Sequence, residues 1–235
     1  RSGYDFVNSD HDFFDDHAMA HGSVVSHVIN DKLKEYDVPH KILPVKVADA
    51  AGVASYFDIV CGMSYALPRC HMMNFSIGWQ DNSGFDPADD PMDTIMNTLI
   101  SNYEDKVLFI TSAGNSGQDN DTHPHFPSNY PNPNILVVAA AKNSGTEAWS
   151  LTNFGENEVD LYSDGFGINF LDMANNSLSF SGTSFSTPHI AAIAARVRYS
   201  TGLTNPLDIK AEIVSMGIPV NYSGKATLYD RYVAN

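Results

Sequence analysis

The segment Gly182-Thr183-Ser184-Phe185-Ser186-Thr187-Pro188-His189, followed by the apolar run Ile190–Ala195, decides the fold of this chain. It predicts a short strand before Gly182 and a helix that begins near Pro188, because glycine permits a tight turn and proline suits the first helical turn. Ser184 would then expose its hydroxyl at the positive end of a helix, where developing negative charge is stabilised. The same pattern fits an ordinary helix cap, so this segment alone leaves both interpretations open.

Two further segments place suitable side chains at the boundaries of predicted elements. His21 directly precedes an apolar helical stretch, and Asn115 follows Gly114 at the end of a β-rich run. A nucleophilic serine needs a base that takes its proton and donors that stabilise the oxyanion. Histidine, asparagine and serine, in this order along the chain, are the residue types that this chemistry requires.

The three motifs, His21-Gly22-Ser23, Ala113-Gly114-Asn115-Ser116-Gly117 and Gly182–His189, resemble those of the subtilisin-like serine peptidases, and the resemblance covers nearly the whole chain. It implies a serine endopeptidase that hydrolyses peptide bonds through an acyl-enzyme. Ser184 would be the nucleophile, His21 the base and Asn115 the oxyanion donor.

The resemblance also implies substrate-binding segments and neighbouring elements. An extended polypeptide substrate would pair with Ser76, Ile77 and Gly78, and the primary specificity pocket would be lined by Ser112, Ala113 and Gly114. Residues 42–47 match a central strand of the family, and residues 229–234 resemble its short closing helix.

The alternation of strand and helix patterns predicts an α/β fold, a three-layer sandwich with a mostly parallel central sheet. By resemblance it is subtilisin-like, and residues 1–235 form a single catalytic domain that is incomplete at its N-terminus. We expect helices near 21–36, 54–67, 91–104, 188–201 and 206–215, and strands near 42–47, 71–76, 107–111 and 135–140.

The family's triad aspartate is missing from this sequence. The resemblance implies a strand ending in Asp-Ser/Thr-Gly before the histidine, but no apolar run before His21 ends in this way. Asp15 and Asp16 are interpreted as loop or cleft carboxylates. Three explanations remain: a separate N-terminal fragment of the same precursor, a chain that begins late, or a catalytically silent binding protein. We favour the fragment, because a sheet without a central strand exposes unpaired backbone groups.

Composition narrows the class of partner. A formal net charge of −15 with only 13 Lys and Arg argues against nucleic acid. No apolar run is long enough to span a membrane, and no signal peptide is visible. A secreted, cell-surface or periplasmic location is expected, with its signal in the missing N-terminal part.

Cysteines and histidines leave smaller questions open. Cys61 and Cys70 either form a disulfide, which an exported enzyme allows, or remain two small buried thiols. No His-Glu-x-x-His spacing appears, so we expect no metal at the catalytic centre and no required cofactor. Structural calcium is known in the family, but no calcium loop motif is recognisable here.

Overall fold

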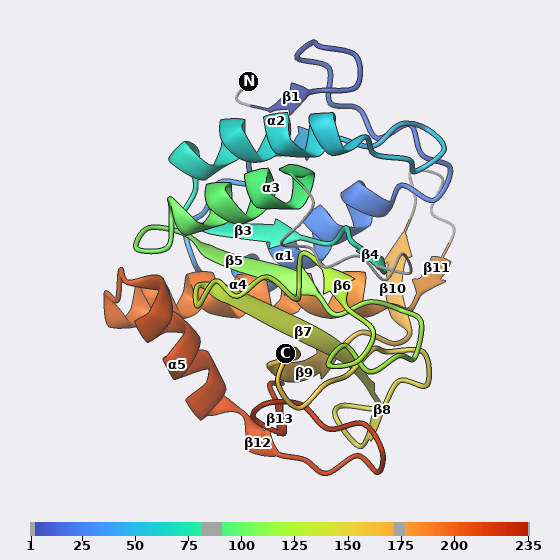
Figure 1. Cartoon of the computed structure of the whole chain (residues 1–235), viewed down its shortest axis with the longest axis vertical. Coiled ribbons are helices and arrows are strands. Elements are labelled where there is room, and N and C mark those ends of the chain that lie inside the picture. The colour runs from blue at the N-terminus through green and yellow to red at the C-terminus, as the bar shows by residue number, and fades with distance from the viewer. Residues whose placement is uncertain (1–2, 81–90, 172–176, 235) are drawn as a thin grey trace.

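The computed structural model describes residues 3–80, 91–171 and 177–234. Within them, a seven-stranded sheet runs in the order β12-β13-β9-β7-β5-β3, with β8 paired to β7 (Figure 1). Neighbours from β3 to β9 and from β9 to β13 are parallel, and only the short β8 and β12 are antiparallel. The strands are β3 (Met72–Phe75), β5 (Leu108–Ser112), β7 (Ile135–Lys142), β8 (Glu147–Ala148), β9 (Leu161–Asp164), β12 (Ile218–Pro219) and β13 (Arg231–Tyr232).

Helices cover both faces of this sheet, as the alternating pattern predicts. One apolar core joins Phe109 and Val137 to α2 and α3, and a second joins Leu108 and Val138 to α4 and α5. Successive strand side chains point to opposite faces, so β5 and β7 supply both cores at once. The helices are α1 (His21–Glu35), α2 (Tyr56–Ala66), α3 (Pro91–Ser101), α4 (Thr183–Thr201) and α5 (Pro206–Met216). The predicted three-layer α/β fold is confirmed.

Among the described residues, six short strands and one 3₁₀ turn lie outside the main sheet. They are β1 (Tyr4–Asp5), β2 (Val45–Lys46), β4 (Trp79–Gln80), β6 (His125–Phe126), β10 (Ile168–Leu171), β11 (Ser177–Phe180) and the 3₁₀ turn Leu67–Arg69. β1 pairs with β2, β4 with β6, and β10 with β11. The strand expected at 42–47 is therefore regular only at Val45–Lys46, and its partner is β1.

The helix that carries the serine begins earlier than its proline suggests. α4 starts at Thr183, directly after Gly182, and Pro188 lies inside it. Proline has no N–H, so it leaves the carbonyl of Ser184 without its usual helical donor. The Ser76 hydroxyl donates to that carbonyl at 2.9 Å, which satisfies the free oxygen and lets the helix run through Pro188.

The prediction of a closing helix at residues 229–234 is wrong. Arg231–Tyr232 forms β13, which pairs antiparallel with β12 and parallel with β9. Tyr232 enters the core under α2 and α3, and Val233 enters the core under α4 and α5. Burial of consecutive side chains on opposite faces is the strand pattern, and it overrides the resemblance.

The cysteines remain free thiols, so the disulfide left open by the sequence is absent. Cys61 lies in α2, whereas Cys70 follows the 3₁₀ turn in extended conformation and lines a groove described below. Burial raises the pKa of the Cys70 thiol to about 11, so it is protonated and unreactive at neutral pH.

Candidate active site

Ser184 lies in the first turn of α4, held against the end of β3. Its Oγ donates to the backbone oxygen of Ser76 at 3.3 Å, and the Ser76 hydroxyl donates in return to the Ser184 carbonyl at 2.9 Å. This reciprocal pair fixes the start of the helix relative to the strand end. Among the described residues the hydroxyl donates through this one long contact, so a base can take over its proton at small cost.

Asn115 is oriented by the residue that precedes the serine. Its Oδ1 accepts from the Thr183 N–H at 2.8 Å and from the Thr183 hydroxyl at 3.0 Å. Thr183 Oγ1 itself accepts from the Gly114 N–H at 3.2 Å. Because the oxygen of the amide has two donors, its orientation is fixed and the Nδ2 group remains available as a hydrogen-bond donor.

His21 is the first residue of α1, and its ring centroid lies 5.4 Å from that of Phe185. Burial lowers the pKa of His21, the nearby Asp15 charge raises it, and His17 lowers it; the net direction is down. An imidazole with a lowered pKa is neutral at neutral pH, which is the state that a general base requires.

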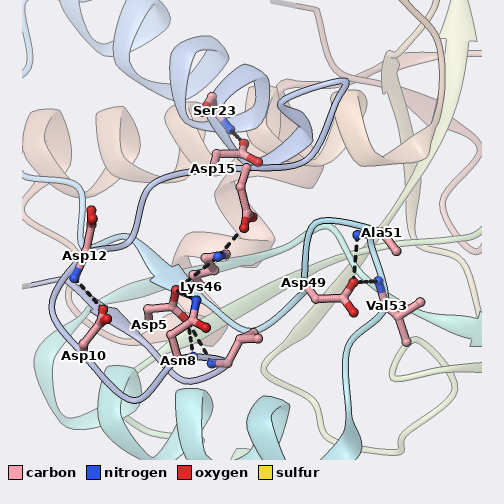
Figure 2. Close-up of polar contacts among 12 residues, drawn as sticks. Asp5, Asn8, Asp10, Asp12, Asp15, Ser23, Lys46, Asp49, Ala51 and Val53 are labelled. Atoms are coloured by element: carbon pink, nitrogen blue, oxygen red, sulfur yellow. Dashed lines mark hydrogen bonds and ion pairs between the residues drawn. The ribbon is translucent and has the colours of Figure 1, made fainter.

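The acidic residues near His21 bind other groups (Figure 2). Asp15 Oδ2 accepts the Ser23 N–H at 2.7 Å in the first turn of α1. Asp16 Oδ1 forms an ion pair with Lys46 at 3.0 Å, and Lys46 also pairs with the fully buried Asp5 at 3.1 Å. Within the described residues neither Asp15 nor Asp16 is hydrogen-bonded to the His21 ring, so both are cleft and loop carboxylates.

A single cleft of ≈ 1390 Å³ brings the predicted residues together. It is lined by His21, Asn115 and Ser184, and also by Ser76, Ile77, Gly78, Ser112 and Gly114. Ala113, which the resemblance placed in the specificity pocket, is fully buried in the core beneath it. His125 lines the same cleft, and no local sequence pattern singled it out.

A second cavity, the strand groove, opens beside the cleft. It has a volume of ≈ 910 Å³ and is lined along one side by residues 42–45 and 47 and along the other by residues 72–77. Among the described strands, β2 pairs only with β1 and β3 only with β5, so each has an unpaired edge. Side chains of α1, α2 and α4, including Val25, Met63 and Ala191, make it apolar, and His21 lies at its boundary with the cleft.

The described residues were compared with what a metal site and a membrane-spanning helix require. Across the described ranges, no cluster of at least three His, Cys, Asp or Glu side chains is arranged to hold a metal ion. None of the helices in those ranges is both long and apolar enough to cross a bilayer.

The chain is similar to known proteins over most of its length. The subtilase family model matches residues 2–222. The chain is 27% identical over 202 residues to the thermostable alkaline protease of Halalkalibacterium halodurans, covering 83% of this chain and 51% of that protein. It is 27% identical to alkaline serine exoprotease A of Vibrio alginolyticus, covering 91% and 37%, and 30% identical to the subtilisin-like serine protease Pen ch 13 of Penicillium rubens, covering 70% and 39%.

A solved structure is similar to this chain over its whole length. A crystal structure of a cold adapted subtilisin-like serine proteinase superposes with a TM-score of 0.80 at 26% identity, covering 100% of this chain and 80% of that one. The chain spans about half or less of the length of the curated relatives, with 51%, 37% and 39% covered. On the strength of the family match over nearly its whole length, the chain belongs to the subtilase family.

Proposed function

We propose that this chain is the catalytic part of a subtilisin-like serine endopeptidase that hydrolyses polypeptides through an acyl-enzyme. The observation that carries the proposal is the convergence on one cleft of Ser184 from α4, His21 from α1 and Asn115 from the loop after β5. The relatives named above are proteases, which supports the same reaction class.

The roles follow from the contacts of each side chain. Ser184 Oγ leaves its long bond to Ser76 and attacks the scissile carbonyl while His21 takes its proton. The Asn115 Nδ2 group and the Ser184 backbone N–H donate to the oxyanion. His21 then protonates the leaving amine, and water releases the acyl group by the same steps in reverse.

The substrate would bind as an extended chain along residues 76–78. These residues leave β3 and line the cleft next to Ser184, so a peptide can add to them as a further strand. Ser112 and Gly114 border the space that would receive the side chain before the scissile bond.

The strand groove is the candidate site for the carboxylate that this sequence lacks before His21. We propose that it receives an apolar strand from a separate N-terminal segment of the same precursor, ending in Asp-x-Gly. Two unpaired strand edges, an apolar lining and the position of His21 at one end of the groove support this occupant. The aspartate would orient the His21 ring and stabilise its charged form; loss of such a partner costs about 10⁴ in turnover.

An alternative is a catalytically silent binding protein of the same fold. The fact that Asp15 and Asp16 are engaged elsewhere favours it, because no carboxylate of the described residues is hydrogen-bonded to the His21 ring. The two functions differ in one measurable property, the gain in peptidase activity when the groove is filled.

The test is complementation with synthetic peptides. An apolar peptide ending in Asp-Ser-Gly and a control ending in Asn-Ser-Gly are added to the purified chain, and hydrolysis of a fluorogenic casein is measured. Both peptides should raise the melting temperature, and only the aspartate peptide should raise turnover, by up to about 10⁴. Intact-mass analysis first establishes that the preparation holds no processed fragment. Background activity with both peptides, despite binding, would favour the silent protein.

Location and cofactors complete the proposal. A secreted, cell-surface or periplasmic location fits a degradative peptidase, and the mechanism above requires no cofactor. Structural calcium stays a prediction, for which a shift of melting temperature on adding and chelating the ion is the direct measurement.

A further inference from the structure

His125 occupies the wall of the cleft between two substrate-binding segments. It begins β6 and pairs with Gln80 of β4, the strand that directly follows Gly78. A β-carbon on Gly78 would lie 2.8 Å from His125 Nε2, and one on Gly114 would lie 2.9 Å from its Cδ2. The glycines therefore make room for the imidazole, whose outer edge stands between residues 76–78 and residues 112–114.

The hydrogen bonds of Ser128 fix which ring nitrogen carries the proton. The Ser128 hydroxyl donates its single proton to the carbonyl oxygen of His125 at 2.6 Å. The same oxygen lies 2.9 Å from His125 Nδ1, and it can only accept there. Nδ1 is therefore protonated.

Burial leaves the other nitrogen as an acceptor. The side chain is 6% exposed, and burial lowers the pKa of His125 to about 4, so the ring is neutral at neutral pH. Nε2 then carries a lone pair and no proton. Within the described part of the chain no donor reaches it, although His125 lines the cleft.

We propose that His125 determines the primary specificity of this peptidase, by closing off the depth of the pocket and presenting Nε2 as a hydrogen-bond acceptor to the substrate side chain. The inference rests on the proposed function, because the pocket is defined by Ser184 and its neighbours. An uncharged side chain with an N–H or O–H donor, such as Gln, Asn, Ser or Thr, satisfies Nε2. A large apolar side chain leaves that nitrogen desolvated without a partner, while a carboxylate repels its lone pair.

The expected preference is about 10–100-fold in kcat/KM for an amide or hydroxyl side chain over Phe or Leu, the range for leaving one buried polar group unpaired. The assay uses a fluorogenic peptide library varied only at the residue before the scissile bond. His125→Ala should invert the preference, and Ser128→Ala should weaken it by freeing the ring to change tautomer. His123→Ala, an exposed neighbour outside the cleft lining, is the matched control and should change nothing.

Two measurements keep this inference separate from the proposed function. Fluorophosphonate labelling of Ser184 is measured in the wild-type chain and in the His123→Ala control with the strand groove filled, and an unlabelled wild-type chain under that condition would refute the peptidase itself. Normal labelling with an unchanged preference in His125→Ala would refute only the specificity role. Long-range ¹H–¹⁵N NMR of the unaltered chain should find Nδ1 protonated and Nε2 bare, and the opposite tautomer would overturn the inference without any mutation.

Discussion

Substitution of Asn115 should separate two roles that its oxygen and nitrogen perform. Asn115→Ala removes the acceptor of the Thr183 N–H and of the Thr183 hydroxyl, in a residue that is 0% exposed. Leaving a buried donor unsatisfied costs about 1–3 kcal/mol, so unfolding should become easier by that amount. Loss of the Nδ2 donor should also slow the reaction of Ser184 by about 10²–10³.

Asn115→Asp isolates the second role. An aspartate keeps an oxygen for both donors of Thr183, so the free energy of unfolding should change by less than about 1 kcal/mol. It has no N–H to offer the oxyanion and adds a negative charge beside it. The reaction should therefore slow at least as much as in Asn115→Ala, about 10²–10³ or more.

The assay is the second-order rate constant for phosphonylation of Ser184 by a fluorophosphonate, because the phosphonyl oxygen occupies the oxyanion position. Urea unfolding supplies the stability, and Asn102→Ala, at an exposed asparagine, is the control. An Asn115→Asp chain that reacts at the wild-type rate would refute the assignment of Nδ2 as the donor.

Two further changes follow from charge and burial. Asp15→Asn removes the carboxylate that raises the pKa of His21 while keeping an oxygen for the Ser23 N–H, so an NMR titration should find the His21 pKa lower; an unchanged titration would contradict this coupling. Burial lowers the pKa of His125 to about 4 and, with the Lys32 charge, that of His189 to about 3, against an ordinary value of 6.5. Between pH 6.5 and the lowered pKa values, the unfolded chain binds more protons than the folded chain. The free energy of unfolding should therefore fall as pH falls, by about 2–3 kcal/mol per histidine from pH 6.5 to 4.5. Urea unfolding between pH 6.5 and 4.5 measures this loss of stability. A free energy of unfolding that stays constant over this range would contradict the burial of both neutral imidazoles.

The features that the sequence predicts correctly are those determined by local patterns of residues. Helix and strand positions follow from apolar periodicity, which is why β7 and α5 were expected within a few residues of their bounds. The start of α4 was misplaced because Pro188 is accommodated by Ser76, a residue far away in sequence. The segment at 229–234 was misassigned because its conformation depends on pairing with β9.

The candidate site also contains some residues that local motifs predict and others that depend on contacts between distant segments. His21, Asn115 and Ser184 carry recognisable motifs, and the structure brings them to one cleft. His125 carries no motif, since its position depends on the pairing of β6 with β4 and on space left by two glycines. The sequence holds no strand that ends in Asp-x-Gly before His21, and the strand groove lies between residues 42–47 and residues 72–77; its occupant remains a prediction.

The most direct test of a serine peptidase in this chain is covalent labelling. The purified protein is treated with a fluorophosphonate, digested and analysed by mass spectrometry, beside Ser184→Ala and His21→Ala. One adduct should map to the peptide that contains Ser184, be absent from Ser184→Ala, and form several orders of magnitude more slowly in His21→Ala. An adduct that persists in Ser184→Ala, or a wild-type chain that stays unlabelled with its strand groove filled, would contradict the account.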